Sequence, residues 1–181
     1  AVPVEGIAWH IIGRKIIEAD HHFHGGDYYE HPDSLRGLQI ARMVGHMTYL
    51  SPESLQRKFG RRRRGGTRQF EIDSYFEYQG KKFSGQYDAN SYIRVQAAMD
   101  EMDLAEQHGS LEAAFAKWRG RTLLVSFDSD WLFPPNEAKA VAAAMKGDVR
   151  HEELSSPNGH DTFLIDYDLI SEPVRTFLAS V

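Results

Sequence analysis

The sequence has no cysteine among its 181 residues, which excludes a disulfide scaffold and thiolate chemistry and fits a reducing compartment. It also has no apolar run near the roughly 20 residues that a membrane span needs, and no basic-then-apolar signal at its start. Hydrophobic residues make up 41% and charged residues 26%, as in ordinary globular proteins. We therefore expect one domain that works in the cytoplasm and has no membrane partner.

An excess of positive charge is also missing, because the formal net charge is −5, so we expect no nucleic-acid partner. One basic run, Arg61-Arg62-Arg63-Arg64, lies between glycines and could bind nucleic acid or another anionic ligand. We favour a flexible, solvated loop, because the rest of the chain is acidic and no aromatic residues interleave with the arginines. An attraction for a phosphorylated cosubstrate stays open.

The first two thirds of the chain predict helices. Apolar residues recur at helical spacing between residues 6 and 20, and Pro32-Asp33-Ser34 is a favourable start for a second helix to about Tyr49. Further helices are expected at residues 51–58, 88–102 and 111–118, whereas residues 70–79, closed by Gly80, fit a helix or a strand. The chain lacks an initiator methionine and begins almost directly with a helix, so we expect the numbering to start part-way through a longer protein.

Three histidines, His21, His22 and His24, lie in a polar, glycine-rich stretch. They could bind a metal ion, but no fourth ligand has a spacing that fixes a coordination geometry. We expect a solvated loop here, and we predict no metal site in the chain.

After residue 120 the pattern changes, because residues 122–127 are a short apolar and β-branched run, and strand-like runs then alternate with helical segments. Residues 122–127 and 149–154 read as strands, and residues 136–145, 163–167 and 172–180 read as helices. Strand, loop, helix, strand, loop, helix is the pattern that closes a doubly wound parallel sheet, so the fold class is α/β. In such sheets the functional loops lie at the carboxyl ends of the strands.

An acid and a histidine occupy these two loops. Asp130 follows the first strand and His160 follows the second, in the acid-then-histidine order of α/β-hydrolase triads. Asp128 is a rival acid in the same loop, and spacing alone does not exclude it. The nucleophile is missing, because no Gly-x-Ser-x-Gly elbow follows an apolar strand anywhere in the chain.

Arg42 and Tyr49 are seven residues apart and lie on one face of a predicted helix. A guanidinium and a phenol hydroxyl on one face can hold a carboxylate. Spacing alone makes this a weak signal, because an exposed arginine beside a half-buried tyrosine is the commoner explanation.

Five stretches of the chain resemble the signature of the homoserine O-acetyltransferase family, and they follow the family's order over nearly all 181 residues. They are residues 37–51 (GLQIARMVGHMTYLS), 58–61 (KFGR), 87–92 (YDANSY), 129–135 (SDWLFPP) and 158–161 (NGHD).

The resemblance implies an α/β-hydrolase fold, of which this chain holds the C-terminal part with an inserted helical lid. Residues 1–31 would then join the missing core to the lid, residues 32–120 would form the lid, and residues 121–181 would form the C-terminal part of the core. The family is usually dimeric through the lid. We therefore expect a homodimer and, as a further partner, the missing N-terminal half of the same enzyme.

The resemblance also assigns roles to single residues. It makes Asp130, in preference to its rival, the acid of the triad and His160 the base. Arg42 and Tyr49 match lid residues that hold the substrate carboxylate, and Asp161 matches the acid that meets the substrate ammonium group.

The implied activity is transfer of an acyl group from an acyl-CoA cosubstrate, with acetyl-CoA expected and no further cofactor, to the hydroxyl of L-homoserine in methionine biosynthesis. An upstream serine would carry the acyl group between the two substrates in a ping-pong mechanism, so we expect this polypeptide alone to be inactive. The alternatives are an esterase on the same scaffold and a non-catalytic lid fragment that dimerises. The sequence does not decide between acetyl and succinyl donors, or between homoserine and serine as acceptor.

Overall fold

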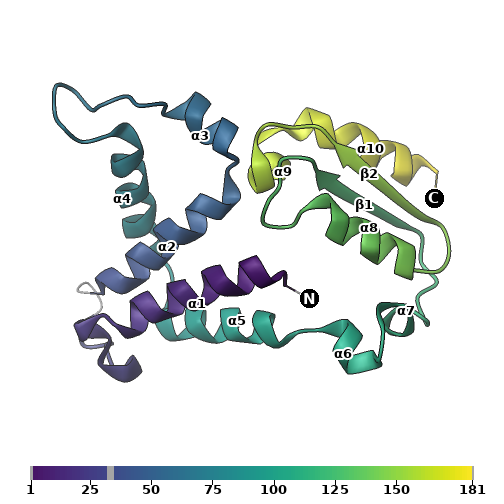
Figure 1. Ribbon diagram of the computed structural model, residues 1–181, viewed down its shortest axis with the longest axis horizontal. Helices are drawn as coiled ribbons and strands as arrows, with labels where there is room; N and C mark the ends of the chain where they lie inside the picture. Colours follow the sequence, from purple (N-terminus) through teal and green to yellow (C-terminus); the bar gives the residue numbers. More distant parts are fainter. Residues whose placement is uncertain (1, 32–34, 181) are drawn as a thin grey trace. The chain divides into compact units, whose positions relative to one another are not determined.

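The computed structural model describes residues 2–31 and 35–180, which form two compact units (Figure 1). Residues 2–48 and 56–102 make up the first, which we call the helical unit. Residues 49–55 and 103–180 make up the second, which we call the sheet unit. The division of the chain at residues 31 and 120 stays a prediction.

The helical unit contains α1 (Val4–Glu18), a 3₁₀ segment η1 (His21–Gly26), most of α2 (Arg36–Tyr49), the end of α3 (Pro52–Lys58), α4 (Glu71–Ser84) and α5 (Ala89–Glu101). Its core consists of Ile17, Phe23, Tyr28, Leu35, Leu38, Ala41 and Ala89. Asp100 ties α5 to α1, since its carboxylate oxygens lie 2.6 Å from His10 Nδ1 and 2.6 Å from Arg14 Nη1. Both partners are largely buried, so this polar contact fixes how the two helices pack.

Most of the predicted helices are present in this unit. Asp88 caps α5 as expected, accepting a hydrogen bond from the Ser91 N–H, whereas the start predicted at residues 32–34 lies outside the described residues. Of residues 70–79, which fitted a helix or a strand, residues 71–79 form part of a helix, and Phe70 is its extended N-cap. The expectation that Gly80 ends this element is wrong, because α4 continues to Ser84. Gly80 is buried, and a Cβ there would lie 2.8 Å from the Gln39 carbonyl oxygen, so close packing against α2 explains this glycine.

The sheet unit begins with two short helices and then forms a parallel pair of strands. Its elements are α6 (Leu104–His108), α7 (Leu111–Ala114), β1 (Thr122–Phe127), α8 (Pro135–Ala144), β2 (Val149–Leu154), the 3₁₀ turn η3 (Gly159–Asp161), α9 (Thr162–Ile165) and α10 (Tyr167–Ala179). The strands pair in register from Thr122 opposite Val149 to Phe127 opposite Leu154. Within this unit α8 and α10 lie on opposite sides of the strands (Figure 1). Because the strands are parallel, the loop that follows β1 and the loop that follows β2 both start at the same, carboxyl edge of the sheet.

Both predicted strands have the predicted bounds, but the helices around them differ in part. The helix expected at residues 111–118 is only one turn long, and α6 was not expected. The last helix starts at Tyr167 rather than at residue 172 and continues through Pro173. The Asp166 side chain accepts a hydrogen bond from the Leu169 N–H, which explains the early start. Among the residues described, no helix has the length and apolar character needed to cross a membrane.

His46 in α2 gives the helical unit a pH-dependent stability. It is 7% exposed, and burial, together with the nearby Arg42 charge, lowers its pKa from 6.5 to about 4. The unfolded chain binds a proton on this side chain below about pH 6.5, whereas the folded chain does not. The free energy of unfolding should therefore decrease as the pH falls from about 6.5 to about 4, by up to about 3 kcal/mol.

Urea unfolding between pH 7 and pH 4 measures this effect. The His46→Gln variant should lose most of the pH dependence in this window, whatever its stability at pH 7. The His108→Gln variant, altered at an exposed histidine, should keep it. A pH profile for His46→Gln as steep as that of the unaltered chain would contradict the assignment.

Candidate active site

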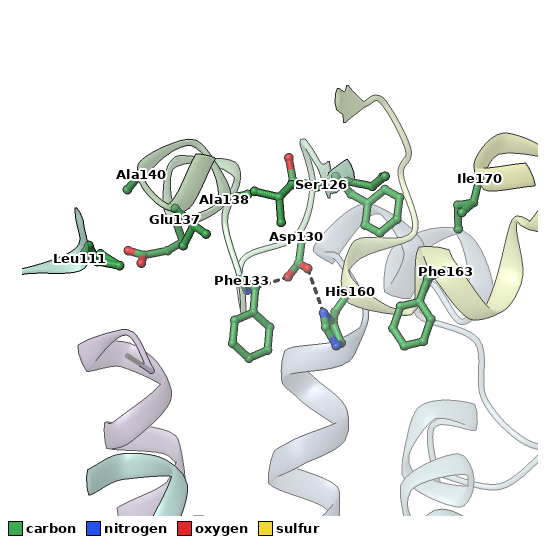
Figure 2. Close-up of a pocket in the computed structure, with 14 residues that line it drawn as sticks. Leu111, Ser126, Asp130, Phe133, Glu137, Ala138, Ala140, His160, Phe163 and Ile170 are labelled. Carbon is green, nitrogen blue, oxygen red and sulfur yellow. Dashed lines mark hydrogen bonds and ion pairs between the residues drawn. The ribbon is translucent and has the colours of Figure 1, made fainter. Parts of the chain in front are cut away.

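Asp130 and His160 form a hydrogen-bonded pair at the carboxyl edge of the sheet (Figure 2). Asp130 follows β1 and is buried, with a relative exposure of 6%. Its Oδ1 accepts hydrogen bonds from the N–H groups of Leu132 and Phe133, both at 2.9 Å. Its Oδ2 lies 2.9 Å from His160 Nδ1. One oxygen thus fixes the carboxylate, and the other orients the imidazole.

The imidazole of His160 lies among aromatic rings. The ring centroids of Phe133 and Phe163 are 5.3 and 5.4 Å from it, and that of Tyr49 is 6.1 Å away. Phe133 and Phe163 flank the histidine in Figure 2. Because Nδ1 faces the carboxylate, Nε2 is the ring nitrogen that can accept a proton from a nucleophile.

Asp128, the rival acid, has a different partner. Its Oδ1 accepts a hydrogen bond of 3.0 Å from the Ser156 N–H. Ser156 lies near the start of the segment 155–161, which follows β2, carries His160 and is called the histidine loop below. This backbone hydrogen bond, together with one from the Ser155 side chain, holds the pKa of Asp128 below its usual value. The geometry therefore pairs His160 with Asp130, while Asp128 joins the two loops.

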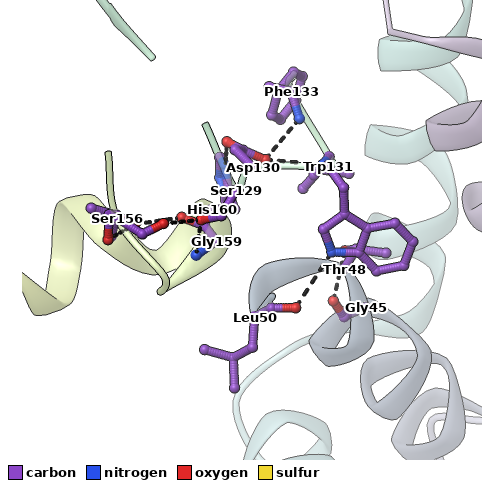
Figure 3. A network of polar contacts seen from close by, with 12 residues as sticks. Gly45, Thr48, Leu50, Ser129, Asp130, Trp131, Phe133, Ser156, Gly159 and His160 are labelled. Carbon is purple, nitrogen blue, oxygen red and sulfur yellow. Dashed lines mark hydrogen bonds and ion pairs between the residues drawn. The ribbon is translucent and has the colours of Figure 1, made fainter. Parts of the chain in front are cut away.

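Hydroxyl groups hold the histidine loop in place (Figure 3). The Ser129 hydroxyl accepts a hydrogen bond of 2.9 Å from the Gly159 N–H and donates one to the Ser156 carbonyl. The Thr162 hydroxyl lies 2.6 Å from the Gly159 carbonyl oxygen and 3.0 Å from Ser156 Oγ. Sequence reasoning missed these side chains, because serine and threonine are common in loops and the partners lie far apart in the sequence.

Residues 49–55 also pack against the histidine loop. The Ser51 hydroxyl donates to the Pro157 carbonyl and accepts a hydrogen bond of 2.9 Å from the Ser54 N–H, so it caps α3 as well. Gly159 has φ 74°, and a Cβ there would lie 2.5 Å from the Ser51 nitrogen. Only glycine fits this position, both for its backbone conformation and for the close approach.

A cavity of about 490 Å³ opens beside the pair (Figure 2). Its wall includes Asp130 and His160 together with Phe133, Phe163 and Val141. Most of the other lining side chains are apolar. The His160 side chain, which is 26% exposed, therefore lies where a reactant in this cavity can reach it.

The predicted substrate-binding residues fall into both units. Tyr49 and Asp161 belong to the sheet unit with the pair, and Asp161 directly follows the histidine in η3. Arg42 belongs to the helical unit, where its guanidinium carbon lies 4.7 Å from the centroid of the Phe83 ring. Arg42 also lines a cavity of about 230 Å³, whose other lining residues are Gln79, Lys82, Phe83, Gln86 and Tyr87.

This cavity is rich in hydrogen-bond donors and contains two cations, which suits an anion such as a carboxylate. The sequence singled out Arg42 but not Lys82, because the two lie on different helices. The roles of all five predicted site residues stay predictions. Among the described residues, no group of three or more His, Asp or Glu side chains could hold a metal ion.

Comparison with known proteins identifies relatives over almost the whole chain. It is 40% identical over 188 residues to the homoserine O-succinyltransferase of Nitrosomonas eutropha, covering 98% of this chain and 50% of that protein. It is 44% identical over 188 residues to the homoserine O-acetyltransferase of Acidiphilium cryptum, covering 97% of this chain and 49% of that protein.

The chain is related to the homoserine O-acetyltransferase family. The resemblance seen in the sequence is thereby confirmed, although no protein-family model matches the chain. The chain spans about half the length of the curated relatives it matches, which is consistent with the C-terminal half of a family member.

Solved structures confirm the fold of the chain. The chain matches the homoserine O-acetyltransferase of Bacillus anthracis with a TM-score of 0.86 and 21% identity, covering 98% of this chain and 50% of that one. It matches esterase E22 with a TM-score of 0.81 and 19% identity, covering 97% and 50%. The predicted partial α/β-hydrolase fold is therefore confirmed.

Proposed function

We propose that the complete protein is a homoserine O-acyltransferase, which moves an acetyl group from acetyl-CoA to the hydroxyl of L-homoserine in methionine biosynthesis. The observation that carries the proposal is the hydrogen-bonded Asp130–His160 pair in a chain about 40% identical to homoserine O-acetyl- and O-succinyltransferases. Relatives with both donor names have similar identities, so acetyl-CoA is the first donor to test and succinyl-CoA the second.

In this proposal the chain supplies the acid and base of a triad whose serine lies outside the 181 residues. His160 Nε2 removes the proton of that serine as it attacks the thioester, and coenzyme A leaves with a proton. His160 then removes the proton of the homoserine hydroxyl, which attacks the acyl-enzyme and releases the ester. Asp130 keeps Nδ1 protonated and stabilises the imidazolium formed in each step.

The charged ends of homoserine provide specificity against water and other alcohols. Arg42 and Tyr49 bind its carboxylate, and Asp161 binds its ammonium group. Buried charge-assisted hydrogen bonds of this kind discriminate strongly, because an acceptor that lacks either group leaves a charged side chain unpaired. We further propose that the protein works in the cytoplasm as a homodimer that associates through the lid.

Esterase activity is the second candidate, favoured by the high structural similarity to esterase E22. An esterase does not need Arg42, Tyr49 and Asp161 to bind the charged ends of an amino acid, a role that we call the clamp. Substrate profiling of the complete protein separates the two functions. Acetyl-CoA-dependent formation of O-acetylhomoserine supports the transferase, whereas hydrolysis of simple acetyl esters without acyl transfer to homoserine supports the esterase.

The Arg42→Ala variant of the complete protein tests the clamp. Loss of a charge-assisted hydrogen bond should raise the KM for homoserine about 10- to 100-fold. Hydrolysis of the acyl-enzyme, which does not use the clamp, should continue at nearly its normal rate. Arg36→Ala is the matched control, because Arg36 lies on the same helix but pairs with Glu77. Equal loss of transfer and hydrolysis in Arg42→Ala would contradict the clamp.

A further inference from the structure

Residues 57–68, which we call the basic segment, concentrate the positive charge of the chain. They hold seven of the 21 lysine and arginine residues and no acidic residue. Because these seven charges are part of a net charge of −5, the rest of the chain carries −12. All seven cationic side chains of the segment are exposed. An acidic protein thus presents one compact basic patch.

The basic segment ends in a tight turn, and its exposure agrees with the solvated loop expected from sequence. Arg63 forms an antiparallel bridge with Phe70, and the Arg64 N–H donates a 2.9 Å hydrogen bond to the Gln69 carbonyl. Gly65 and Gly66, with φ 42° and 75°, form the tip of the turn. Two consecutive positive φ angles suit glycine and match tight hairpin turns. The backbone therefore holds the arginines in a defined arrangement.

Aromatic rings support several of these cations, although no aromatic residue lies between Arg61 and Arg68 in the sequence. The guanidinium carbons of Arg63 and Arg61 lie 4.2 and 5.7 Å from the centroid of the Phe70 ring. Lys58 Nζ lies 4.3 Å from the centroid of the Tyr75 ring. These cation–π contacts stabilise the cations without neutralising their charge.

Carboxylates neutralise little of the segment. Arg62 forms an ion pair of 2.8 Å with Glu71. In the part of the chain that the structure describes, no carboxylate lies within ion-pair distance of Arg61, Arg63, Arg64 or Arg68. Like charges held this close repel one another, and binding of a multivalent anion relieves the repulsion.

We propose that the basic segment binds the phosphate groups of the acyl-CoA donor. Guanidinium groups match phosphate oxygens in a two-point geometry, and coenzyme A carries a diphosphate and a 3′-phosphate close together. In sequence, α3 leads directly from residues 49–55, which hold the histidine loop, into the basic segment. The inference rests on the proposed function, since it names the part of the protein that holds the donor of that reaction.

Binding of adenosine 3′,5′-bisphosphate and coenzyme A to the complete protein, measured by calorimetry, tests the site. The double variant Arg64→Gln, Arg68→Gln removes two charges outside the Phe70 contacts. It should raise the Kd for both ligands and the KM for acetyl-CoA about tenfold, as expected for loss of about one charge-assisted hydrogen bond. The kcat at saturating acetyl-CoA should not change. The control Lys117→Gln, Lys146→Gln removes two exposed charges elsewhere and should change none of these values.

Unchanged Kd values in the arginine double variant would overturn the inference, even if the protein acylates homoserine normally. Arginine-dependent binding of single-stranded DNA or anionic lipid vesicles, without arginine-dependent binding of adenosine 3′,5′-bisphosphate, would also overturn it. Arginine-dependent binding of the bisphosphate and of acetyl-CoA by a protein that does not acylate homoserine would support the phosphate site. It would at the same time refute the proposed acceptor.

Discussion

Asp130→Asn should lower the rate of acyl transfer by the complete protein about 10⁴-fold, the magnitude typical for the acid of a Ser-His-Asp triad. The asparagine oxygen can still accept the hydrogen bonds that Asp130 receives from the Leu132 and Phe133 N–H groups, so the loop should keep its shape. Its amide group, however, presents a donor to His160 Nδ1. The imidazole then carries its proton on Nε2 and cannot act as a base. Steady-state assays with acetyl-CoA and homoserine measure the loss.

Asp128→Asn is the matched control for this variant. It makes the same chemical change two residues away, and its side-chain oxygen can still accept the hydrogen bond from the Ser156 N–H. The rate should fall by less than about tenfold, because Asp128 makes no contact with the imidazole. Equal losses in the two variants would show that the carboxylates act only by holding the loops together.

Gly159→Ala should lower the free energy of unfolding by about 3 kcal/mol and nearly abolish activity. An alanine at φ 74° costs about 1 kcal/mol in backbone strain. Its Cβ would in addition lie 2.5 Å from the Ser51 nitrogen and 3.0 Å from the Tyr49 carbonyl oxygen, so the loop must move, at a further cost of about 2 kcal/mol. The adjacent His160 moves with the loop and loses its alignment.

The Gly109→Ala variant measures the cost of backbone strain alone, without the steric clash expected at Gly159. Gly109 has φ 85°, but a Cβ there meets no atom within 4 Å. This variant should lose only about 1 kcal/mol and keep full activity. Urea unfolding of both variants, combined with the transfer assay, gives the comparison. If Gly159→Ala were no less stable than Gly109→Ala, the close approach to Ser51 would not matter.

The sheet and its two loops could be predicted from local signals together with chain order. An apolar run marks β1, whereas β2 has apolar residues only at its two ends and is predicted from the alternation of strands and helices. Asp130 and His160 follow these strands directly, and parallel strands place both loops at one edge. The pairing of these two residues thus follows from chain order and topology.

Other features depend on contacts between distant segments, which the sequence does not display. Gly80 looks like a helix end, but it is the point where α4 packs against the backbone of Gln39 in α2. The Ser129 hydroxyl gains its role only when the histidine loop folds against it. Lys82 joins Arg42 at one cavity from another helix. The roles of these three residues can be recognised only in the folded chain, because a glycine, serine or lysine can have many other roles.

The Ser51–Pro157 hydrogen bond has a consequence for the order of folding. The two residues are 106 positions apart, so closing this contact in an unfolded chain costs about 4 kcal/mol of loop entropy. During synthesis, residues 2–48 and 56–102 of the helical unit emerge before residues 103–180 and can begin to pack, while residues 49–55 must wait for the last part of the chain. The histidine loop and its support should therefore form late, and variants at Ser51 should speed unfolding more than they slow folding.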